Sequence, residues 1–165
     1  MERTDTALLI VRIVFGAFLA AHGVNKLRGG LASTAGWFAS IGMRRPRAQA
    51  VTAAATEIAA GLMLALGFLT PLACAAIVGT MTVAVVTVHW RVGFFIFLPG
   101  GGWEYCASIA AAATAVSVAG PGAVSVDNAL GLLQGAGWAV AGPLLGVLTA
   151  SLHLAATWRR PGGAS

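Results

Sequence analysis

The sequence has very little charge for its length. Only 9% of its 165 residues are charged and 58% are hydrophobic, whereas soluble domains have roughly 25% charged and roughly 45–50% apolar residues. Glu57 is the only charged residue between positions 48 and 90, and Asp127 is the only one between positions 105 and 158. Segments this long without charge exclude a water-soluble domain. They predict an all-α transmembrane helix bundle whose main partner is the lipid bilayer.

Cysteines and catalytic motifs are also scarce. The two cysteines, Cys74 and Cys106, lie in apolar segments and lack the C-x-x-C spacing of a zinc or redox site, so we predict neither a disulfide nor a metal site. The sequence contains no P-loop, H-E-x-x-H, nucleophile elbow or C-x-x-C-H motif. No catalytic residue can therefore be named, and whether the protein is an enzyme stays open. The net charge of +5 does not predict nucleic-acid binding, because the basic residues lie at the ends of apolar runs.

Five apolar segments are candidates for membrane-spanning helices, each close to the ~20 residues that a span requires. The first is too long for the hydrophobic region of a signal peptide, so we expect it to remain in the protein. The break at Thr70–Pro71 is very short and makes the second and third spans antiparallel neighbours. Gly131-x-x-x-Gly135 and Gly142-x-x-x-Gly146 have the spacing of close helix contacts. The predicted spans are residues 6–27, 49–69, 72–90, 103–119 and 137–158.

Two connections are too apolar for ordinary solvated loops. In residues 29–48 we predict a short helix capped by Ser33 or Thr34, lying at the membrane surface or partly re-entrant. Residues 91–102 are too short to span the membrane, so we expect them to enter the interface or to cover the end of the bundle. The apolar residues of the short helix, expected on one side, are Trp37, Phe38 and Ile41.

Basic residues gather on one side of the predicted five-span topology. Cytoplasmic loops of membrane proteins are enriched in lysine and arginine, so we predict that this side is cytoplasmic. The N-terminus, where Arg3 lies, is then outside, and the C-terminus is inside a multi-pass protein of the cell membrane. The residues on the basic side are Lys26, Arg28, Arg44, Arg45, Arg47, Arg91, Arg159 and Arg160.

Several ionisable residues lie inside the predicted spans, where each is a functional candidate because burying its charge in lipid is costly. At 1.5 Å per helical residue, Glu57 lies about 12 Å from Gln49 at the basic side. We predict that its carboxylate faces the first span and pairs with His22, Lys26 or Arg12. Arg12 lies nearer the opposite side of the membrane. The residues that antiparallel threading brings into one layer are His22, Lys26, Glu57, His89, Glu104 and His153.

Four short motifs together resemble the DoxX family. They are Arg12-Ile-Val-Phe-Gly16, His22-Gly-Val-Asn-Lys26, Glu57-Ile-Ala-Ala-Gly61 and Gly100-Gly-Gly-Trp-Glu104-Tyr105. The resemblance implies a four-helix membrane domain over residues 1–128, and residues 129–165 would add a fifth span and a short basic tail. The site positions that it implies are Arg12, His22, Lys26, Glu57, His89, Glu104 and Tyr105.

The resemblance also suggests a redox context. DoxX relatives include the membrane subunit of a thiosulfate:quinone oxidoreductase, and others are associated with thiol and oxidative-stress homeostasis. Our leading hypothesis is therefore a membrane subunit of a redox-linked assembly with protein partners, at most a quinone-contacting oxidoreductase subunit. Quinone is the one cofactor we expect, since its head needs only a few hydrogen-bonding groups in an apolar slot.

Two alternatives belong to other functional classes. A small transporter or proton relay would use the same carboxylates and histidines along a water-accessible path. A structural anchor for soluble partners would depend on the basic residues 44–47 and would not need Glu57. The sequence does not decide whether the chain forms a homo-oligomer.

Overall fold

The computed structural model describes residues 2–133 and 135–160, and each of the five predicted spans is helical in it. The only β-type pairing among these residues is an isolated antiparallel bridge between Met43 and Trp158. The prediction of an all-helical membrane bundle is therefore confirmed. The elements in chain order are α1 (Arg3–Arg28), α2 (Leu31–Ser40), α3 (Pro46–Leu66), α4 (Thr70–Ala84), the π-helical η1 (Val85–His89), α5 (Glu104–Ala119), α6 (Val126–Leu130) and α7 (Ala136–Thr157).

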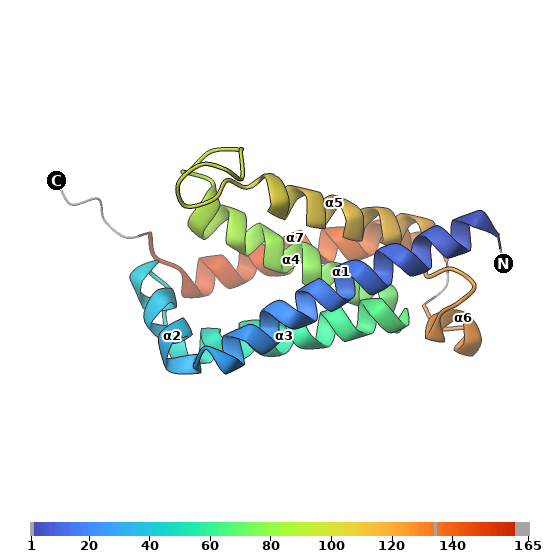
Figure 1. Cartoon of the computed structure of the whole chain (residues 1–165), viewed down its shortest axis with the longest axis horizontal. Helices are drawn as coiled ribbons and strands as arrows, with labels where there is room; N and C mark the ends of the chain where they lie inside the picture. The colour runs from blue at the N-terminus through green and yellow to red at the C-terminus, as the bar shows by residue number, and fades with distance from the viewer. Residues whose placement is uncertain (1, 134, 161–165) are drawn as a thin grey trace.

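The long helices lie side by side with α4 in the middle (Figure 1). Helix α4 contacts α3, α5 and α7, and α1 packs mainly on α3. Within the described residues, four helices are long and apolar enough to cross a membrane, namely α1, α3, α4 continued by η1, and α7. Helix α5 has 16 residues, a length of about 24 Å, and is the shorter fifth member.

The two ends of the bundle differ. Helix α2, the loop of residues 90–103 and the end of α7 lie at one end, and α6 lies at the other end beside the start of α1 (Figure 1). We call the first end the arginine-rich end, because Arg28, residues 44–47, Arg91 and residues 159–160 all belong to it.

Close helix contacts are made at glycines. A Cβ atom on Gly16 would lie 2.5 Å from the Gly61 carbonyl oxygen, and one on Gly61 would lie 2.5 Å from that of Gly16. These two positions let α1 and α3 approach backbone to backbone, as membrane helices do where small residues meet. Gly146 has the same role on α7, where a Cβ would lie 2.4 Å from the Ala75 carbonyl oxygen of α4. The predicted contact at the Gly142/Gly146 spacing is therefore confirmed, and it is internal to this chain.

The other predicted glycine contact is wrong. Gly131 and Gly135 have open space around them rather than a neighbouring helix. They lie at the end of α6 and just before α7, with φ angles of 65° and 136°. The G-x-x-x-G spacing here reflects two turns, because such positive φ angles suit glycine best.

The short helix predicted within residues 29–48 exists as α2, but its predicted cap is wrong. The helix begins at Leu31 after Gly30, whose φ is 91°, and no side chain caps it. Ser33 and Thr34 lie inside its first turn. Phe38 is buried, whereas Trp37 is 45% exposed, because successive helix residues point about 100° apart.

The loop of residues 90–103 folds back on itself at the arginine-rich end. The backbone N–H groups of Trp103 and Glu104 donate hydrogen bonds to the carbonyl oxygens of Gly93 and Phe94, at 3.0 and 2.9 Å. The rings of Trp90 and Trp103 stack with their centroids 6.1 Å apart. Residues 94–97 keep their apolar side chains exposed, as the prediction of an interfacial segment requires.

Candidate functional site

The centre of the candidate site is an ion pair between α1 and α3. The Lys26 Nζ atom lies 2.5 Å from Glu57 Oε2, and the Glu57 side chain is 8% exposed. The close crossing of α1 over α3 produces this pairing, since Gly23 lets α1 rest on the backbone of Ala54 and Ile58. The prediction that Glu57 faces the first helix is confirmed, and Lys26 is the partner among the three candidates.

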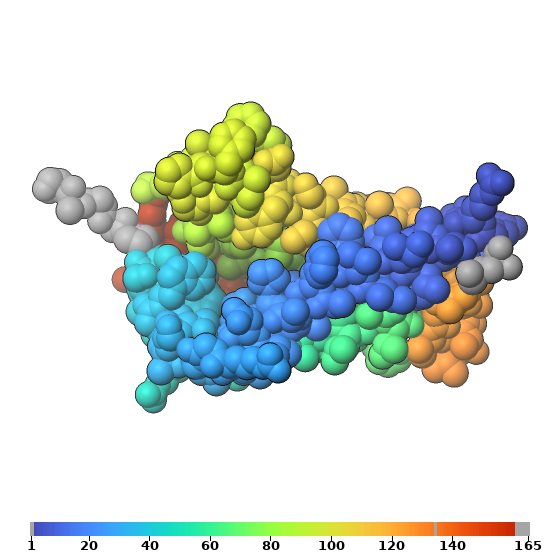
Figure 2. Space-filling view, viewed as in Figure 1, coloured from blue at the N-terminus to red at the C-terminus, as the bar shows by residue number. Residues whose placement is uncertain are grey.

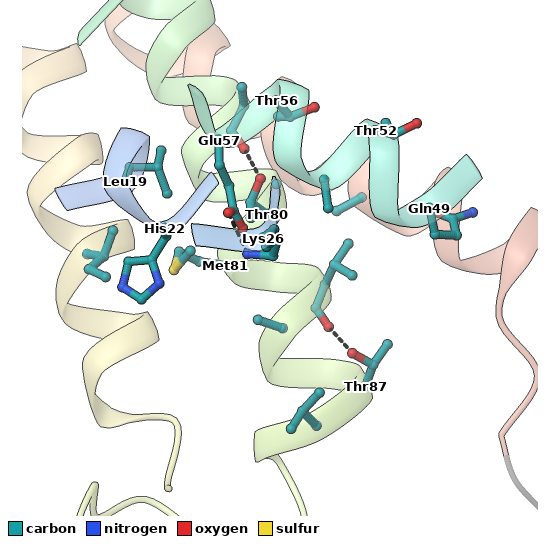
Figure 3. Close-up of a pocket in the computed structure, with 18 of the residues that line it drawn as sticks. Leu19, His22, Lys26, Gln49, Thr52, Thr56, Glu57, Thr80, Met81 and Thr87 are labelled. Carbon is teal, nitrogen blue, oxygen red and sulfur yellow. Dashed lines mark hydrogen bonds and ion pairs between the residues drawn. The ribbon is translucent and has the colours of Figure 1, made fainter. Parts of the chain in front are cut away.

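A cavity of about 810 Å³ adjoins this pair in the half of the bundle nearer the arginine-rich end (Figure 3). All five long helices contribute to its wall, which is mainly apolar. A volume of this size suits a small organic ligand, because typical pockets measure ≈ 300–1,000 Å³. The titratable side chains in the wall are His22, Lys26, Glu57, His89, Tyr105 and His153.

Threonines supply much of the remaining polarity of the wall. The hydroxyl groups of Thr80 and Thr87 each donate a 2.8 Å hydrogen bond to the carbonyl oxygen four residues earlier, at Ala76 and Val83 (Figure 3). Their protons are thus engaged within the helix, and only the oxygen lone pairs are available to a ligand. The Lys26 ammonium group is different, because it has three N–H donors and Glu57 takes one of them.

The cavity reaches the molecular surface on the sides of the bundle. Its wall includes exposed residues of α1, among them Phe18 and His22, and the exposed Tyr105 of α5. Helices α1 and α5 touch only sparsely, and Figure 2 shows a recess between them with α4 in its floor. Thr52 on α3 and Thr149 on α7 are also exposed wall residues. These openings lie along the bundle, where lipid surrounds a membrane protein.

A second hydrogen-bonded pair joins η1 to α5 at the cavity. The Tyr105 hydroxyl lies 3.0 Å from His89 Nε2, and His89 Nδ1 lies 2.7 Å from the Gly101 carbonyl oxygen. The two rings meet edge to face, with centroids 5.3 Å apart. His89 ends the π-helical turn, an irregularity that occurs frequently at functional sites.

Two of the predicted site residues lie outside the cavity wall. Glu104 Oε2 accepts a hydrogen bond of 3.1 Å from the Ile96 backbone N–H and so helps to fold the preceding loop. Arg12 lies towards the opposite end of the bundle, in agreement with its predicted depth. The structure therefore brings together five of the seven predicted positions, namely His22, Lys26, Glu57, His89 and Tyr105.

Arg12 belongs to a separate buried polar cluster. It is 1% exposed, and its guanidinium group donates to the carbonyl oxygens of Pro121 and Val124, the second at 2.6 Å. Its charge attracts Asp127, which is also 1% exposed. A Cβ atom on Gly67 would lie 2.6 Å from Arg12 Nη1, so only glycine fits against the guanidinium group.

Asp127 is a structural residue that the sequence analysis missed. Its carboxylate accepts hydrogen bonds from the backbone N–H groups of Leu69 and Thr70, both at 2.7 Å. These are among the donors that the first turn of α4 leaves free, and a negative charge is favourable there. A signal was present, because Asp127 is the only charged residue in a long apolar region. The depth of a residue along a membrane-spanning helix could not identify the partner of Asp127, because α6 is not part of such a helix.

Metal binding has no support in residues 2–133 and 135–160, where no group of three or more histidine, cysteine or acidic side chains could hold an ion. Cys74 and Cys106 are free thiols with no exposed surface. They belong to the apolar core, which extends from the cavity wall at Leu19 and Met81 to Leu64 and Val116.

The apolar helices and the buried ion pair define an integral membrane protein of the small helical-bundle class. Residues 7–90 match the DoxX family, to which the chain belongs. It is also 34% identical over 125 residues to the inner membrane protein YphA of Escherichia coli (strain K12), in an alignment that covers 73% of this chain and 88% of that protein. No solved structure matches the chain. The matched family segment includes His22, Lys26, Glu57 and His89, whereas Tyr105 lies beyond it.

Proposed function

We propose that the protein is a quinone-binding membrane subunit of a redox-linked assembly. The observation that carries this proposal is the cavity of about 810 Å³ with openings along the sides of the bundle. A quinone is an apolar molecule that dissolves in the bilayer, so it would enter laterally between α1 and α5. Its oxygen atoms would meet the polar groups of the wall, and its tail would lie against the apolar residues.

The polar groups suit this ligand because few of them are charged and unpaired. Lys26 is neutralised by Glu57 at 2.5 Å and retains further N–H donors for a carbonyl oxygen. His22 and Tyr105 lie at the exposed edge of the cavity. A highly charged ligand would need a net opposite charge in the wall, whereas a neutral one needs only hydrogen bonds.

The packing of the opposite half of the bundle favours binding over transport. A solute or proton path would have to continue from the cavity towards the end where α1 begins. Apolar side chains pack together there, among them Leu64, Ile77 and Val116, and the void between them measures about 10 Å³. Beyond them, the Arg12 guanidinium group is bonded to backbone carbonyl oxygens.

The assembly and the orientation are further parts of the proposal. The redox partner proteins are expected from the family resemblance alone. The basic residues of the arginine-rich end favour a cytoplasmic location for that end in the cell membrane. A green fluorescent protein fused after the last residue should then be fluorescent in cells, and a periplasmic reporter fused at the same point should be inactive.

The binding proposal is tested by filling the cavity. Ala53 and Ala59 both lie on α3, but only Ala53 lines the cavity, and Ala59 is exposed elsewhere. Protein purified in mild detergent should retain cellular quinone and should bind a decyl-substituted benzoquinone in calorimetric titrations. Ala53→Phe should weaken this binding at least about tenfold, which corresponds to about 1.4 kcal/mol. Ala59→Phe, the matched control, should bind like the unmodified protein. Absence of binding by the unmodified protein at saturating quinone would refute the proposal.

A further inference from the structure

The hydrogen-bond chain Gly101–His89–Tyr105 fixes where its protons lie. The Gly101 carbonyl oxygen can only accept, so the His89 Nδ1 atom at 2.7 Å must have a proton and donate it. In the neutral imidazole the other nitrogen, Nε2, then has no proton and accepts. The Tyr105 hydroxyl at 3.0 Å must therefore donate its proton to His89.

This arrangement determines what Tyr105 offers to the cavity. With its proton directed at His89, the hydroxyl can use only its oxygen lone pairs towards a ligand, and it acts as an acceptor. If His89 takes up a proton, Nε2 becomes a donor and the direction of the bond reverses. The Tyr105 oxygen then accepts from His89, and its own proton turns to the cavity. Both states use the same positions of the heavy atoms, so the reversal requires no movement of the helices.

We propose that Tyr105 is a specificity-determining residue whose hydroxyl selects the redox form of the bound ligand according to the protonation of His89. This inference rests on the proposed quinone binding and adds to it. A hydroquinone has O–H groups that donate, and it is favoured when His89 is neutral. A quinone has carbonyl oxygens that accept, and it is favoured when His89 is protonated. Histidine ordinarily changes charge between about pH 5 and pH 8.

The other titratable groups of the site define the necessary controls. His22 and Lys26 come from α1, Glu57 from α3 and His153 from α7, and all of them line the same cavity. Cys106 adjoins Tyr105 on α5, and Arg91 and Glu104 lie in or next to the loop that supplies Gly101. Because His22 and His153 line the same cavity, a pH effect must be assigned to His89 by substitution.

The experiment measures the dissociation constants of a decyl-substituted benzoquinone and of its hydroquinone, without oxygen, between pH 5.5 and pH 8. In the unmodified protein, the ratio of the quinone dissociation constant to the hydroquinone dissociation constant should increase about fivefold with rising pH. This factor corresponds to one net hydrogen bond of about 1 kcal/mol. His89→Gln cannot titrate and should abolish the pH dependence of this preference. Tyr105→Phe should abolish it as well, without placing a new polar group in the cavity. Glu104→Gln, a control at a carboxylate outside the cavity wall, should keep it.

The outcomes separate this inference from the proposed function. If both ligand forms bind but their ratio does not change with pH, or if the change persists in His89→Gln, the role of Tyr105 is refuted while quinone binding stands. If neither form binds to the unmodified protein, the proposed function fails and this inference fails with it. Circular dichroism of each variant tests whether it is folded. His89→Gln and Tyr105→Phe change opposite ends of the same hydrogen bond, so the same result from both supports the role of that bond.

Discussion

Removal of the Glu57 carboxylate tests the structural basis of the site. In Glu57→Ala, the ammonium group of Lys26 loses its partner in a region where Glu57 is 8% and Lys26 23% exposed. Breaking a fully buried ion pair costs about 3–5 kcal/mol. The cost should be smaller here, because Lys26 is partly exposed and its long side chain can reach towards the arginine-rich end. We therefore expect a loss of about 2 kcal/mol in the free energy of unfolding.

A second substitution distinguishes the lost pair from a simple loss of packing. Lys26→Met removes the charge but keeps most of the aliphatic chain. In the double variant no unpaired charge remains, so it should be about 1 kcal/mol more stable than Glu57→Ala alone. Residues in direct contact typically show interaction energies of about 0.5–3 kcal/mol in such a cycle.

The measurement is unfolding in mixed micelles of a mild detergent and sodium dodecyl sulfate, followed by the fluorescence of the five tryptophans. Glu104→Ala serves as a control carboxylate, because the Glu104 side chain at the start of α5 accepts a hydrogen bond from the backbone of the exposed loop residue Ile96. The loss of unfolding free energy in this variant should not exceed about 1.5 kcal/mol, the upper net value of an ordinary hydrogen bond. If the two single substitutions at the ion pair add up to the double variant within about 0.5 kcal/mol, the pair does not stabilise the bundle and our reasoning is refuted.

Three further predictions concern the rest of the bundle. Arg12→Met should lower stability by about 3 kcal/mol or more, because it removes a buried charge that attracts the buried Asp127 and the donor of two backbone hydrogen bonds. Unfolding titrations should detect this, and an effect below about 1 kcal/mol would contradict the described cluster. Gly146→Val should separate α7 from α4 and cost at least about 2 kcal/mol, whereas Gly137→Val, with open space around it, should cost under about 1 kcal/mol by thermal unfolding. Trp158→Phe should cost about 1 kcal/mol, since it removes the 2.8 Å hydrogen bond to Ile41; unchanged proteolysis of the α2 region would contradict this.

Much of the fold could be predicted because the bilayer restricts the choices. In the membrane, a chain with so little charge must form its backbone hydrogen bonds within helices. The breaks near Thr70 and Gly120 determine where these helices begin and end. The Glu57 prediction succeeded for a related reason. Its depth left few partners, and Lys26 lies at a similar depth on the adjacent helix.

Other features depend on how the helices meet, which helical periodicity alone does not determine. The predicted cap of α2 was wrong because the helix already begins at Leu31, directly after Gly30, whose backbone φ is positive. Gly131 and Gly135 have the spacing of a helix contact but occur in turns. The cavity itself is a property of the crossing of α1 over α3 and of the weak contact between α1 and α5. The division of the chain after residue 128 remains a prediction.

Arg12 is buried and Lys26 is partly exposed, and the surroundings of these two cations differ. The guanidinium group of Arg12 donates to two backbone carbonyl oxygens and is attracted by Asp127, with a glycine packed directly against it. That cluster joins α1 and the start of α4 to residues 121–127 at one end of the bundle. Lys26 has a single carboxylate partner among the residues the structure describes, and its ammonium group borders open volume. The N–H groups of Lys26 that Glu57 does not take can therefore donate to a polar ligand atom in the cavity.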